Sequence, residues 1–283
     1  MSVRTIAVLG AGQMGAGIAQ VAAAAGYDVV MRDIEDRFVL GGLSKIQGRL
    51  QRAVSKGELD AAAQEAIRSR IRGTLDMAAA AKADLVIEAV PEEPELKKSV
   101  LREMDRMAAP QTILASNTSS ISIGELAAAT RRPDRFVGMH FFNPVPVMKL
   151  VEVVQGKATS PETLRIALEV CIRMGKTPVE VHDFPGFVSN RVLMPMINEA
   201  ILALQDGVAT KEAIDTVMKL GANHPMGPLE LADFIGLDTC LNILEVLERG
   251  FASNKYAPAP LLRRMVSEGK LGKKSGHGFY EYA

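Results

Sequence analysis

A glycine-rich turn near the start of the chain constrains its fold more than any other feature. Residues 3–9 are apolar and rich in β-branched side chains, as in a parallel strand that is buried on both faces. The sequence Gly10-Ala-Gly12-Gln-Met-Gly15 follows, and residues 16–25 are mostly alanine and glycine. In a strand–turn–helix unit, the first glycine of G-x-G-x-x-G permits the tight turn, the second admits a pyrophosphate group, and the third lets the helix lie close to the sheet. The sequence therefore predicts a dinucleotide-binding unit.

A second strand and an acidic residue complete this unit. Gly26 ends the predicted helix, and residues 27–31 form a strand pattern. Asp33 follows, close to the position roughly 20 residues after the glycine motif where dinucleotide-binding units carry an acid. An acid there binds both ribose hydroxyls of adenosine and repels a 2′-phosphate, which favours NAD over NADP. The adjacent Arg32 leaves NADP possible, because a guanidinium group can pair with that phosphate. The alternative is a glycine-rich turn with a structural role only. The predicted cofactor-binding residues are Gly10, Gly12, Gln13, Met14, Gly15 and Asp33.

Composition narrows the class of protein. The chain has 283 residues, enough for two domains, and its 33 basic and 33 acidic residues give a net charge of zero. Neither nucleic acid nor an anionic membrane is therefore expected as a partner. Cys171 and Cys240 match no metal-binding or redox spacing, so no metal site is expected. No apolar run reaches about 18 residues, and the first predicted strand begins too early for a signal peptide. We expect a cytoplasmic protein.

Two amphipathic helices interrupt the simple alternation of strands and helices. Residues 37–52 and 58–72 carry apolar side chains at helical spacing, and Asp60 is a plausible cap of the second helix. Such a helix pair is longer than a plain crossover between strands. Its basic side chains form either an ordinary solvated face or an arm that contacts phosphate groups; they are Lys45, Arg49, Arg52 and Lys56.

Polar residues follow the next strands of the predicted sheet. Glu92 comes shortly after one apolar strand, and a cluster of short polar side chains, residues 116–120, follows the next. Carboxyl ends of parallel strands are where such sheets bind ligands. Glu92 is therefore either a solvated charge at a helix start or a ligand of the cofactor. The cluster either caps a turn and a helix or lines the nicotinamide end of a cleft. The strands are expected over residues 83–90, 112–115, 136–139, 147–154 and 177–181.

His140 and Glu152 are the candidate catalytic pair. His140 follows the apolar strand 136–139, and Glu152 lies in the apolar strand 147–154, after a connection bent by two prolines. A carboxylate in such a strand needs a partner if it is buried. A hairpin-like return of the chain would bring it to His140, so that the carboxylate orients the imidazole ring and stabilises its charged form. The alternative is a histidine with a structural role only.

The character of the chain changes near Asp183. Helical patterns then cover residues 188–204, 210–220, 229–247 and 261–268, and a strand pattern returns only at residues 278–282. We therefore expect an α/β domain over residues 1–183, with a Rossmann-type, doubly wound and mostly parallel sheet and a helical-pair insertion. An all-α domain is expected over residues 184–283.

Several longer blocks along nearly the whole chain carry a family resemblance. They are GAGQMGAGIAQVAA from Gly10, ASNTSS from Ala115, GMHFFNPVPVMKLVEVV from Gly138, PGFVSNR from Pro185, KLGANHPMGPLELADFIGLD from Lys219 and GKKSGHGFYEY from Gly272. In these blocks the chain resembles the short-chain 3-hydroxyacyl-CoA dehydrogenases, most closely the bacterial 3-hydroxybutyryl-CoA dehydrogenases. The resemblance implies an oxidoreductase that reversibly oxidises a (3S)-3-hydroxyacyl-CoA to the 3-ketoacyl-CoA, with hydride transfer to NAD. Fatty-acid and butanoate metabolism both use this step.

The resemblance also implies roles for particular residues. His140 would be the general base or acid and Glu152 its orienting partner. The reacting oxygen or the thioester carbonyl would be bound by Ser119 and Asn190. Further cofactor positions would be Glu92, Lys97, Ser119, Asn143 and Lys274. The helix pair would contact CoA through Lys56, Arg49 and Arg52, although the family often has serine where this chain has Arg49. The helical domain would bind substrate and form a homodimer.

Two rival functions stand beside this one. A non-catalytic, structural relative would keep the fold and could lose the candidate catalytic pair. A dehydrogenase of free 3-hydroxy acids would share the glycine turn but use a lysine as its acid or base. The presence of His140, Glu152, Ser119 and Asn190 argues against both rivals.

Overall fold

The computed structural model describes residues 3–282 of the chain. The chain divides into two compact units, Met1–Phe184 and Pro185–Ala283, each with its own hydrophobic core. The outer ends of the two predicted domains, residues 1–2 and 283, lie outside the described residues. The functions assigned to the two domains stay predictions.

The first unit is built on one eight-stranded sheet with the order β3-β2-β1-β4-β5-β6-β7-β8. Every neighbouring pair is parallel except β6 and β7, which are antiparallel. The predicted Rossmann-type, mostly parallel sheet is therefore confirmed. Its strands are β1 (Thr5–Leu9), β2 (Asp28–Arg32), β3 (Ile71–Thr74), β4 (Leu85–Glu88), β5 (Ile113–Ser116), β6 (Phe136–Phe141), β7 (Leu150–Gln155) and β8 (Thr177–His182).

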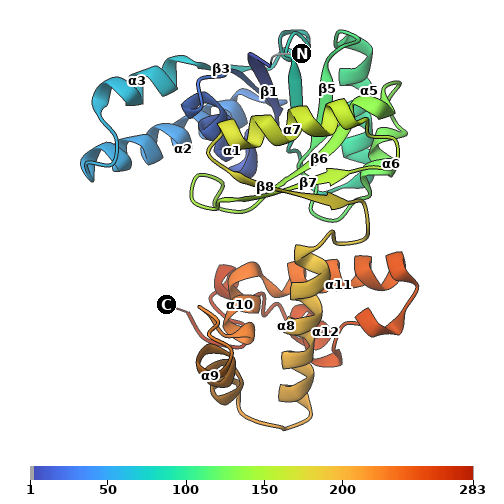
Figure 1. Cartoon of the computed structure of the whole chain (residues 1–283). Coiled ribbons are helices and arrows are strands. Elements are labelled where there is room, and N and C mark those ends of the chain that lie inside the picture. Colours follow the sequence, from blue (N-terminus) through green and yellow to red (C-terminus); the bar gives the residue numbers. More distant parts are fainter. Residues whose placement is uncertain (1–2, 283) are drawn as a thin grey trace. The chain divides into compact units, whose positions relative to one another are not determined.

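Helices lie on both sides of this sheet (Figure 1). The predicted helix pair is present as α2 and α3 and projects from the unit. The Asp60 carboxylate caps α3 by accepting the Ala63 N–H at 2.6 Å. The helices are α1 (Gln13–Ala24), α2 (Asp36–Ser55), α3 (Ala61–Ser69), α4 (Met77–Ala80), α5 (Pro94–Met107), α6 (Ile123–Ala127) and α7 (Pro161–Arg173), with a 3-10 helix at Pro133–Arg135.

The turn between β1 and α1 depends on two glycines. Gly10 has a φ of 103°, and a Cβ on it would lie 2.5 Å from the Ala89 carbonyl oxygen. A Cβ on Gly15 would lie 1.8 Å from the Gly10 carbonyl oxygen. Only glycine at both positions lets α1 begin this close to β1 and the end of β4. The small buried residues of α1 then pack directly on the sheet.

One edge strand was not predicted. The helix expected over residues 58–72 is wrong at its end, because α3 ends at Ser69 and Ile71–Thr74 pairs in parallel with β2 as β3. This strand is short and only partly buried, and it contains Arg72 and Gly73. It therefore lacks the continuous apolar run by which buried parallel strands are recognised.

The second unit has helices as its only regular elements within residues 185–282, so the predicted all-α architecture is confirmed. Its core is formed mainly by α8, α10, α11 and α12. The helices are α8 (Ser189–Gln205), α9 (Lys211–Gly221), α10 (Pro228–Ile235), α11 (Leu237–Phe251) and α12 (Pro260–Ser267), with 3-10 helices at Asn254–Tyr256 and Lys273–Ser275.

Two local predictions are wrong in this unit. The single helix expected over residues 229–247 is divided into α10 and α11 by Gly236, whose φ is 104°. The strand expected near the end of the chain is replaced by isolated bridges. The backbone N–H groups of Phe279 and Tyr280 instead donate to the carboxylate of Asp233 on α10, at 2.9 Å and 2.8 Å. A buried carboxylate thus takes the place of a partner strand.

We expect Gly15→Ala to lower the free energy of unfolding by about 1–3 kcal/mol or more, because the added Cβ would overlap the Gly10 carbonyl oxygen. Gly48→Ala in the middle of α2 is the matched control. Beyond the backbone of its own helix, its added Cβ would meet no heavy atom within 4 Å, so stability should stay equal or rise by up to about 1 kcal/mol. Urea unfolding measures both changes. A Gly15→Ala variant as stable as the wild type would contradict the packing argument.

Candidate active site

The ends of β1 and β2 place Asp33 beside the glycine turn. Asp33 Oδ2 accepts a hydrogen bond from the Ala11 N–H at 2.6 Å, and Oδ1 accepts one from the Ile34 N–H at 2.7 Å. The Gly10 N–H donates to the Arg32 carbonyl oxygen at 2.8 Å. The acid predicted to bind ribose therefore also holds the turn against the tip of β2.

The start of α1 has room for an anion. Gly12 is the N-cap residue, and among the described residues no side chain caps this helix and no acid lies in its first turn. A Cβ on Gly12 would meet nothing within 4 Å, so packing within the protein does not require glycine there. Open space beside backbone N–H groups and the positive end of a helix dipole suits a pyrophosphate. The residues present thus fit a dinucleotide, with Gln13, Met14 and Gly15 in the first turn of α1.

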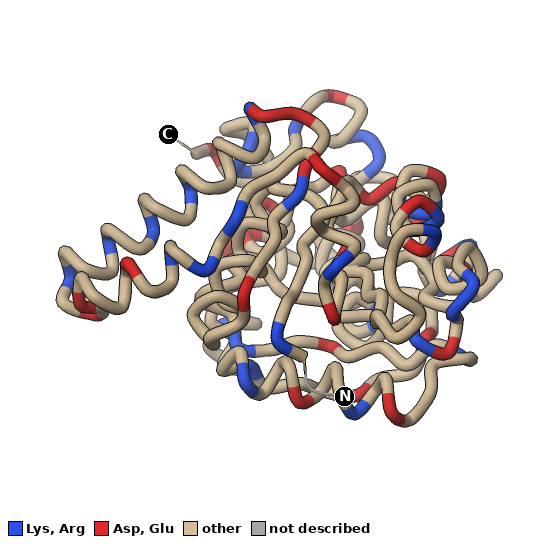
Figure 2. Tube along the Cα trace, turned by 90° about the horizontal axis from the view of Figure 1, so that it is seen from above, with Lys and Arg blue, Asp and Glu red and all other residues tan. Residues whose placement is uncertain are grey.

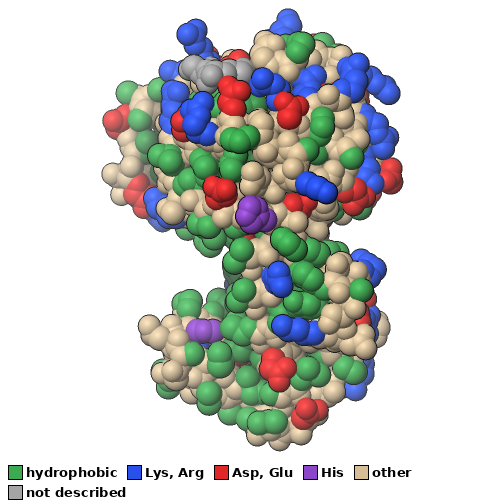
Figure 3. Space-filling view, turned by 45° about the vertical axis from the view of Figure 1, so that its right-hand side comes forward, with side chains coloured by type: hydrophobic (Ala, Val, Ile, Leu, Met, Phe, Trp, Pro, Cys, Tyr) green, Lys and Arg blue, Asp and Glu red, His purple; other side chains and the backbone are tan. Residues whose placement is uncertain are grey.

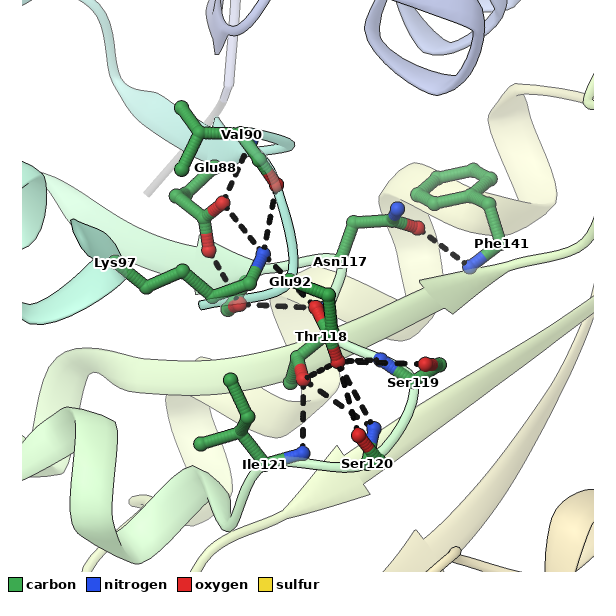
Figure 4. Close-up of polar contacts among 11 residues, drawn as sticks. Glu88, Val90, Glu92, Lys97, Asn117, Thr118, Ser119, Ser120, Ile121 and Phe141 are labelled. Carbon is green, nitrogen blue, oxygen red and sulfur yellow. Dashed lines mark hydrogen bonds and ion pairs between the residues drawn. The ribbon is translucent and has the colours of Figure 1, made fainter. Parts of the chain in front are cut away.

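A buried ion pair joins the end of β4 to the first turn of α5 (Figure 4). Glu88 is 0% exposed and Lys97 is 1% exposed, and Lys97 Nζ lies 2.7 Å from Glu88 Oε1. The other oxygen of Glu88 accepts the hydroxyl of Ser116 at 2.6 Å. Lys97 Nζ also donates to the Val90 carbonyl oxygen at 3.1 Å and lies 3.2 Å from Glu92 Oε2. The ammonium group of Lys97 is thus enclosed by three acceptors of the protein, and its role at the cofactor stays a prediction.

Glu92 holds the loop that follows β5, also visible in Figure 4. Its Oε1 accepts hydrogen bonds from Thr118 Oγ1 at 2.5 Å, from the Ser119 N–H at 2.9 Å and from the Ser120 N–H at 3.2 Å. Burial acts to raise the pKa of Glu92, but the charge of Lys97 and these hydrogen bonds outweigh it and hold the pKa below its ordinary value. Glu92 therefore stays charged at neutral pH and fixes Ser119 at the carboxyl edge of the sheet.

The predicted hairpin brings His140 and Glu152 together. The two residues lie directly opposite each other in the antiparallel register of β6 and β7, so their side chains share one face of the sheet. His140 Nδ1 lies 2.8 Å from Glu152 Oε2, and both side chains are buried. A carboxylate at Nδ1 makes that nitrogen the donor and Nε2 the basic nitrogen of the neutral ring. This is the geometry of a general base with an orienting acid.

Two further contacts connect the strand of His140 with its surroundings. Asn117 at the end of β5 accepts the Phe141 N–H through Oδ1 at 2.9 Å. Gln13 Nε2 donates to Asn143 Oδ1 at 2.7 Å, which joins the first turn of α1 to the loop after β6. Two predicted cofactor residues, Gln13 and Asn143, are therefore in direct contact, and Asn143 is close in the chain to the candidate general base.

Sequence reasoning missed Glu88 and Asn117. Glu88 is an acid within an apolar strand, so the argument that pointed to a partner for Glu152 applies to it equally. Asn117 lies in the cluster of short polar side chains after β5, but its amide holds the neighbouring strand. No sequence signal distinguishes an asparagine that bonds an adjacent strand from one that caps its own turn.

The basic residues of the helix pair lie on α2 and at its end, where Figure 2 marks a series of basic positions. Lys45, Arg52 and Lys56 are exposed, whereas Arg49 is half-buried and donates to Gln20 Oε1 of α1 at 3.3 Å. Burial and the neighbouring Arg52 lower the pKa of Arg49. Positive charge is thus concentrated on this arm, and its contact with CoA stays a prediction.

Two predicted site residues belong to the second unit. Asn190 is buried in the first turn of α8. Lys274 lies in the 3-10 helix Lys273–Ser275, with its Nζ 2.6 Å from Asp238 Oδ2. The roles of Asn190 and Lys274 at the active site stay predictions.

Neither a metal-binding cluster of side chains nor a membrane-spanning helix is present within residues 3–282. No group of three or more His, Cys, Asp or Glu side chains there could hold a metal ion. No helix in that range is long and apolar enough to span a bilayer. Cys171 and Cys240 are buried, and this burial raises the pKa of each thiol to about 12, so neither is a reactive thiolate.

Family models match almost the whole chain. The model for the 3-hydroxyacyl-CoA dehydrogenase NAD-binding domain matches residues 5–184, and the model for the C-terminal domain of the same family matches residues 186–282. The chain is 56% identical over 282 residues to a probable 3-hydroxybutyryl-CoA dehydrogenase of Bacillus subtilis. The match covers 100% of this chain and 98% of that protein. It is 51% identical over 280 residues to the 3-hydroxybutyryl-CoA dehydrogenase of Bradyrhizobium diazoefficiens, with 99% and 96% covered.

A solved structure shares both units. The crystal structure of (S)-3-hydroxybutyryl-CoA dehydrogenase from Ralstonia eutropha matches with a TM-score of 0.98 and 49% identity, over 100% of each chain. Sequence blocks, family models and fold therefore agree along the full length. The chain belongs to the 3-hydroxyacyl-CoA dehydrogenase family.

Proposed function

We propose that this protein catalyses the reversible oxidation of a (3S)-3-hydroxyacyl-CoA to the 3-ketoacyl-CoA, with NAD as cofactor and 3-hydroxybutyryl-CoA as substrate. The contact between His140 and Glu152, 2.8 Å long and made between the neighbouring strands β6 and β7, carries the proposal. The names of the similar proteins support the four-carbon acyl group. Turnover of acetoacetyl-CoA is the direct test.

The candidate catalytic pair moves the proton. In the oxidation, His140 Nε2 takes the proton of the substrate hydroxyl, while Glu152 holds the Nδ1–H and stabilises the imidazolium that forms. In the reduction the same nitrogen returns the proton. The bound nicotinamide supplies the hydride acceptor or donor at C4. Because both side chains are buried, the attraction between imidazolium and carboxylate is screened less than at the surface.

Other residues orient the substrate and the cofactor. We assign to Ser119 and Asn190 the role of forming hydrogen bonds with the reacting oxygen or the thioester carbonyl. Glu92 and Asn143 are assigned to the nicotinamide and its ribose, with Lys97 acting through Glu92, and Lys274 is assigned to the cofactor from the second unit. The CoA phosphates are assigned to Lys56, Arg49 and Arg52. An arginine at position 49 can bind a phosphate through two N–H groups, which a serine cannot.

NAD is the cofactor that the end of β2 favours. Asp33 presents a carboxylate at the place of the ribose, and the pyrophosphate position follows from the room at Gly12. Arg32 Nε donates to the Leu75 carbonyl oxygen at 3.2 Å, which holds part of the guanidinium group on the protein. The negative charge of Asp33 would therefore repel the 2′-phosphate of NADP, and the partly held Arg32 would compensate less for this repulsion.

We further propose that two copies of this chain associate through the second unit and that the protein is cytoplasmic. Hydrophobic side chains are gathered on the visible face of that unit (Figure 3). On α9, Val217 is 65% exposed and Leu220 is 82% exposed, more than expected for large apolar residues of a helix that stays in water. Two buried thiols are compatible with a reducing compartment.

Acetoacetyl-CoA should be reduced rapidly with NADH, and His140→Ala should lower kcat by about 10²–10⁴-fold because the proton donor is lost. The dissociation constant of NADH should stay nearly unchanged, since the predicted cofactor residues are intact. Absorbance of the nicotinamide measures turnover and fluorescence titration measures binding. His182→Ala is the matched control, because His182 is an exposed histidine on the same sheet.

Three outcomes would contradict this assignment. Loss of NADH binding in His140→Ala would mean that His140 serves the cofactor. Cofactor binding without turnover by the wild type would indicate the non-catalytic relative. Turnover of free 3-hydroxybutyrate in preference to the thioester would indicate the free-acid dehydrogenase.

The wild type should use NADH better than NADPH, and Asp33→Asn should reduce this preference in kcat/KM by about 10-fold or more. The substitution removes a repulsion of about 1–4 kcal/mol between the carboxylate and a 2′-phosphate. Parallel assays with both cofactors measure the ratio. A wild type that prefers NADPH, with this preference lost in Arg32→Ala, would instead assign the specificity to Arg32.

The double substitution of Val217 and Leu220 by glutamate should dissociate the proposed dimer. Val217→Glu with Leu220→Glu would place two charges in a buried interface, and we expect the dissociation constant to rise by at least about 30-fold, the equivalent of about 2 kcal/mol. Sedimentation velocity over a range of concentrations measures it. Lys219→Glu, which changes charge on the same helix without removing apolar surface, is the control. A wild type that sediments as a monomer would refute the proposal.

A further inference from the structure

Asp183, directly after β8, ties the end of the first unit to the start of α6. Its Oδ2 accepts hydrogen bonds from Ser122 Oγ and from the Gly124 N–H, both at 2.8 Å, and its Oδ1 accepts the Ile123 N–H at 3.0 Å. The Asp183 N–H donates to the Gln155 carbonyl oxygen at the end of β7, at 3.1 Å. The carboxylate is therefore itself fixed to the sheet. Bonds from an ionised carboxylate to backbone N–H groups are among the stronger hydrogen bonds in proteins.

The segment that Asp183 holds is the far end of the loop that carries Ser119. Glu92 fixes the near end of this loop through Thr118, Ser119 and Ser120. Asp183 fixes its exit into α6. Two carboxylates, one after β4 and one after β8, thus hold the loop from opposite ends. The loop cannot shift at one end without breaking charge-assisted hydrogen bonds.

The start of α6 is also in contact with the strands of the candidate catalytic pair. A Cβ on Gly138 of β6 would lie 2.8 Å from Ile123 Cδ1 and 2.6 Å from Val154 Cβ of β7. The Ile123 side chain therefore fills the space above Gly138, two residues before His140. By holding the Ile123 N–H, Asp183 keeps this side chain in its place. The position of the Ser119 loop is thereby set relative to the strand of His140.

We propose that Asp183 is a positioning residue for the reaction, which keeps Ser119 at a fixed distance from His140 Nε2. The inference rests on the proposed function, in which Ser119 binds the oxygen whose proton His140 transfers. A hydroxyl held by both residues can react only when their separation fits it. A displacement of about 1 Å typically slows such a step by about 10²-fold. Asp183 is also the residue before Phe184, where the first unit ends, so the chain's exit from this unit and the Ser119 loop share one anchor.

Asp183→Asn should lower kcat with acetoacetyl-CoA and NADH by about 10–100-fold. The amide keeps the size of the side chain but presents an N–H₂ group to one of three donors. The dissociation constant of NADH should change by less than about twofold, since the glycine turn, Asp33 and Glu92 are untouched and Ser119 is the one predicted cofactor residue that moves. Asp84→Asn is the matched control. Asp84 Oδ2 accepts the Arg4 and Thr5 N–H groups at 2.8 Å and 3.0 Å, at the opposite edge of the sheet, so kcat should be retained.

A double-mutant cycle with Ser119→Ala separates positioning from a general loss of structure. If Asp183 acts through Ser119, Asp183→Asn should change kcat by less than about twofold in the Ser119→Ala background. The same loss in both backgrounds would overturn the inference, as would wild-type kcat in either single variant. If Asp183→Asn does not fold, Ser122→Ala removes one of the three bonds and enters the same cycle, with a smaller loss expected. An inactive wild type would refute the proposed function and this inference with it, whereas additivity in an active enzyme refutes this inference alone.

Discussion

The buried ion pair of Glu88 and Lys97 is the interaction on which the carboxyl edge of the sheet depends. Two charges removed from water are stable only if close contact and additional hydrogen bonds compensate for lost hydration. Ser116, Glu92 and the backbone of Val90 supply those bonds here. The pair therefore fixes the ends of β4 and β5 and the first turn of α5 in one arrangement. That arrangement determines where Glu92 lies, and through Glu92 it determines the course of the Ser119 loop.

The same physical device recurs along this edge. Asp33 accepts backbone N–H groups at the glycine turn, Glu92 accepts them from the loop after β5, and Asp183 accepts them at the start of α6. Loops between strands and helices leave N–H groups that secondary structure does not satisfy, and carboxylates are their strongest partners among side chains. Each acid thus has a structural role beside any role in binding. A site of this kind is rigid before a ligand arrives, which reduces the entropy lost on binding.

Local patterns were sufficient to predict the dinucleotide unit and the candidate catalytic pair, because a glycine turn and an acid in an apolar strand each need only a few neighbouring residues. Lys97 shows where such patterns end. It is adjacent to Lys98 in an amphipathic helix, and only the rotation of α5 against the sheet determines that Lys97 meets Glu88 while Lys98 pairs with exposed acids. β3 escaped prediction because an edge strand needs no apolar run, and Gly236 divides a pattern that is apolar on both of its sides.

The change from parallel to antiparallel pairing between β6 and β7 explains how a histidine and a glutamate so close in the chain meet. Parallel neighbours need a long crossover, whereas an antiparallel neighbour can return through a short connection. The connection here carries two prolines and is fixed by Lys176, whose buried Nζ donates to the carbonyl oxygens of Val145 and Met148. A one-residue slip of this register would turn Glu152 to the other face of the sheet. The register of β6 and β7 places Oε2 of Glu152 at Nδ1 of His140. The proline-bent connection, Lys176 and the apolar strand residues therefore all help to fix this register.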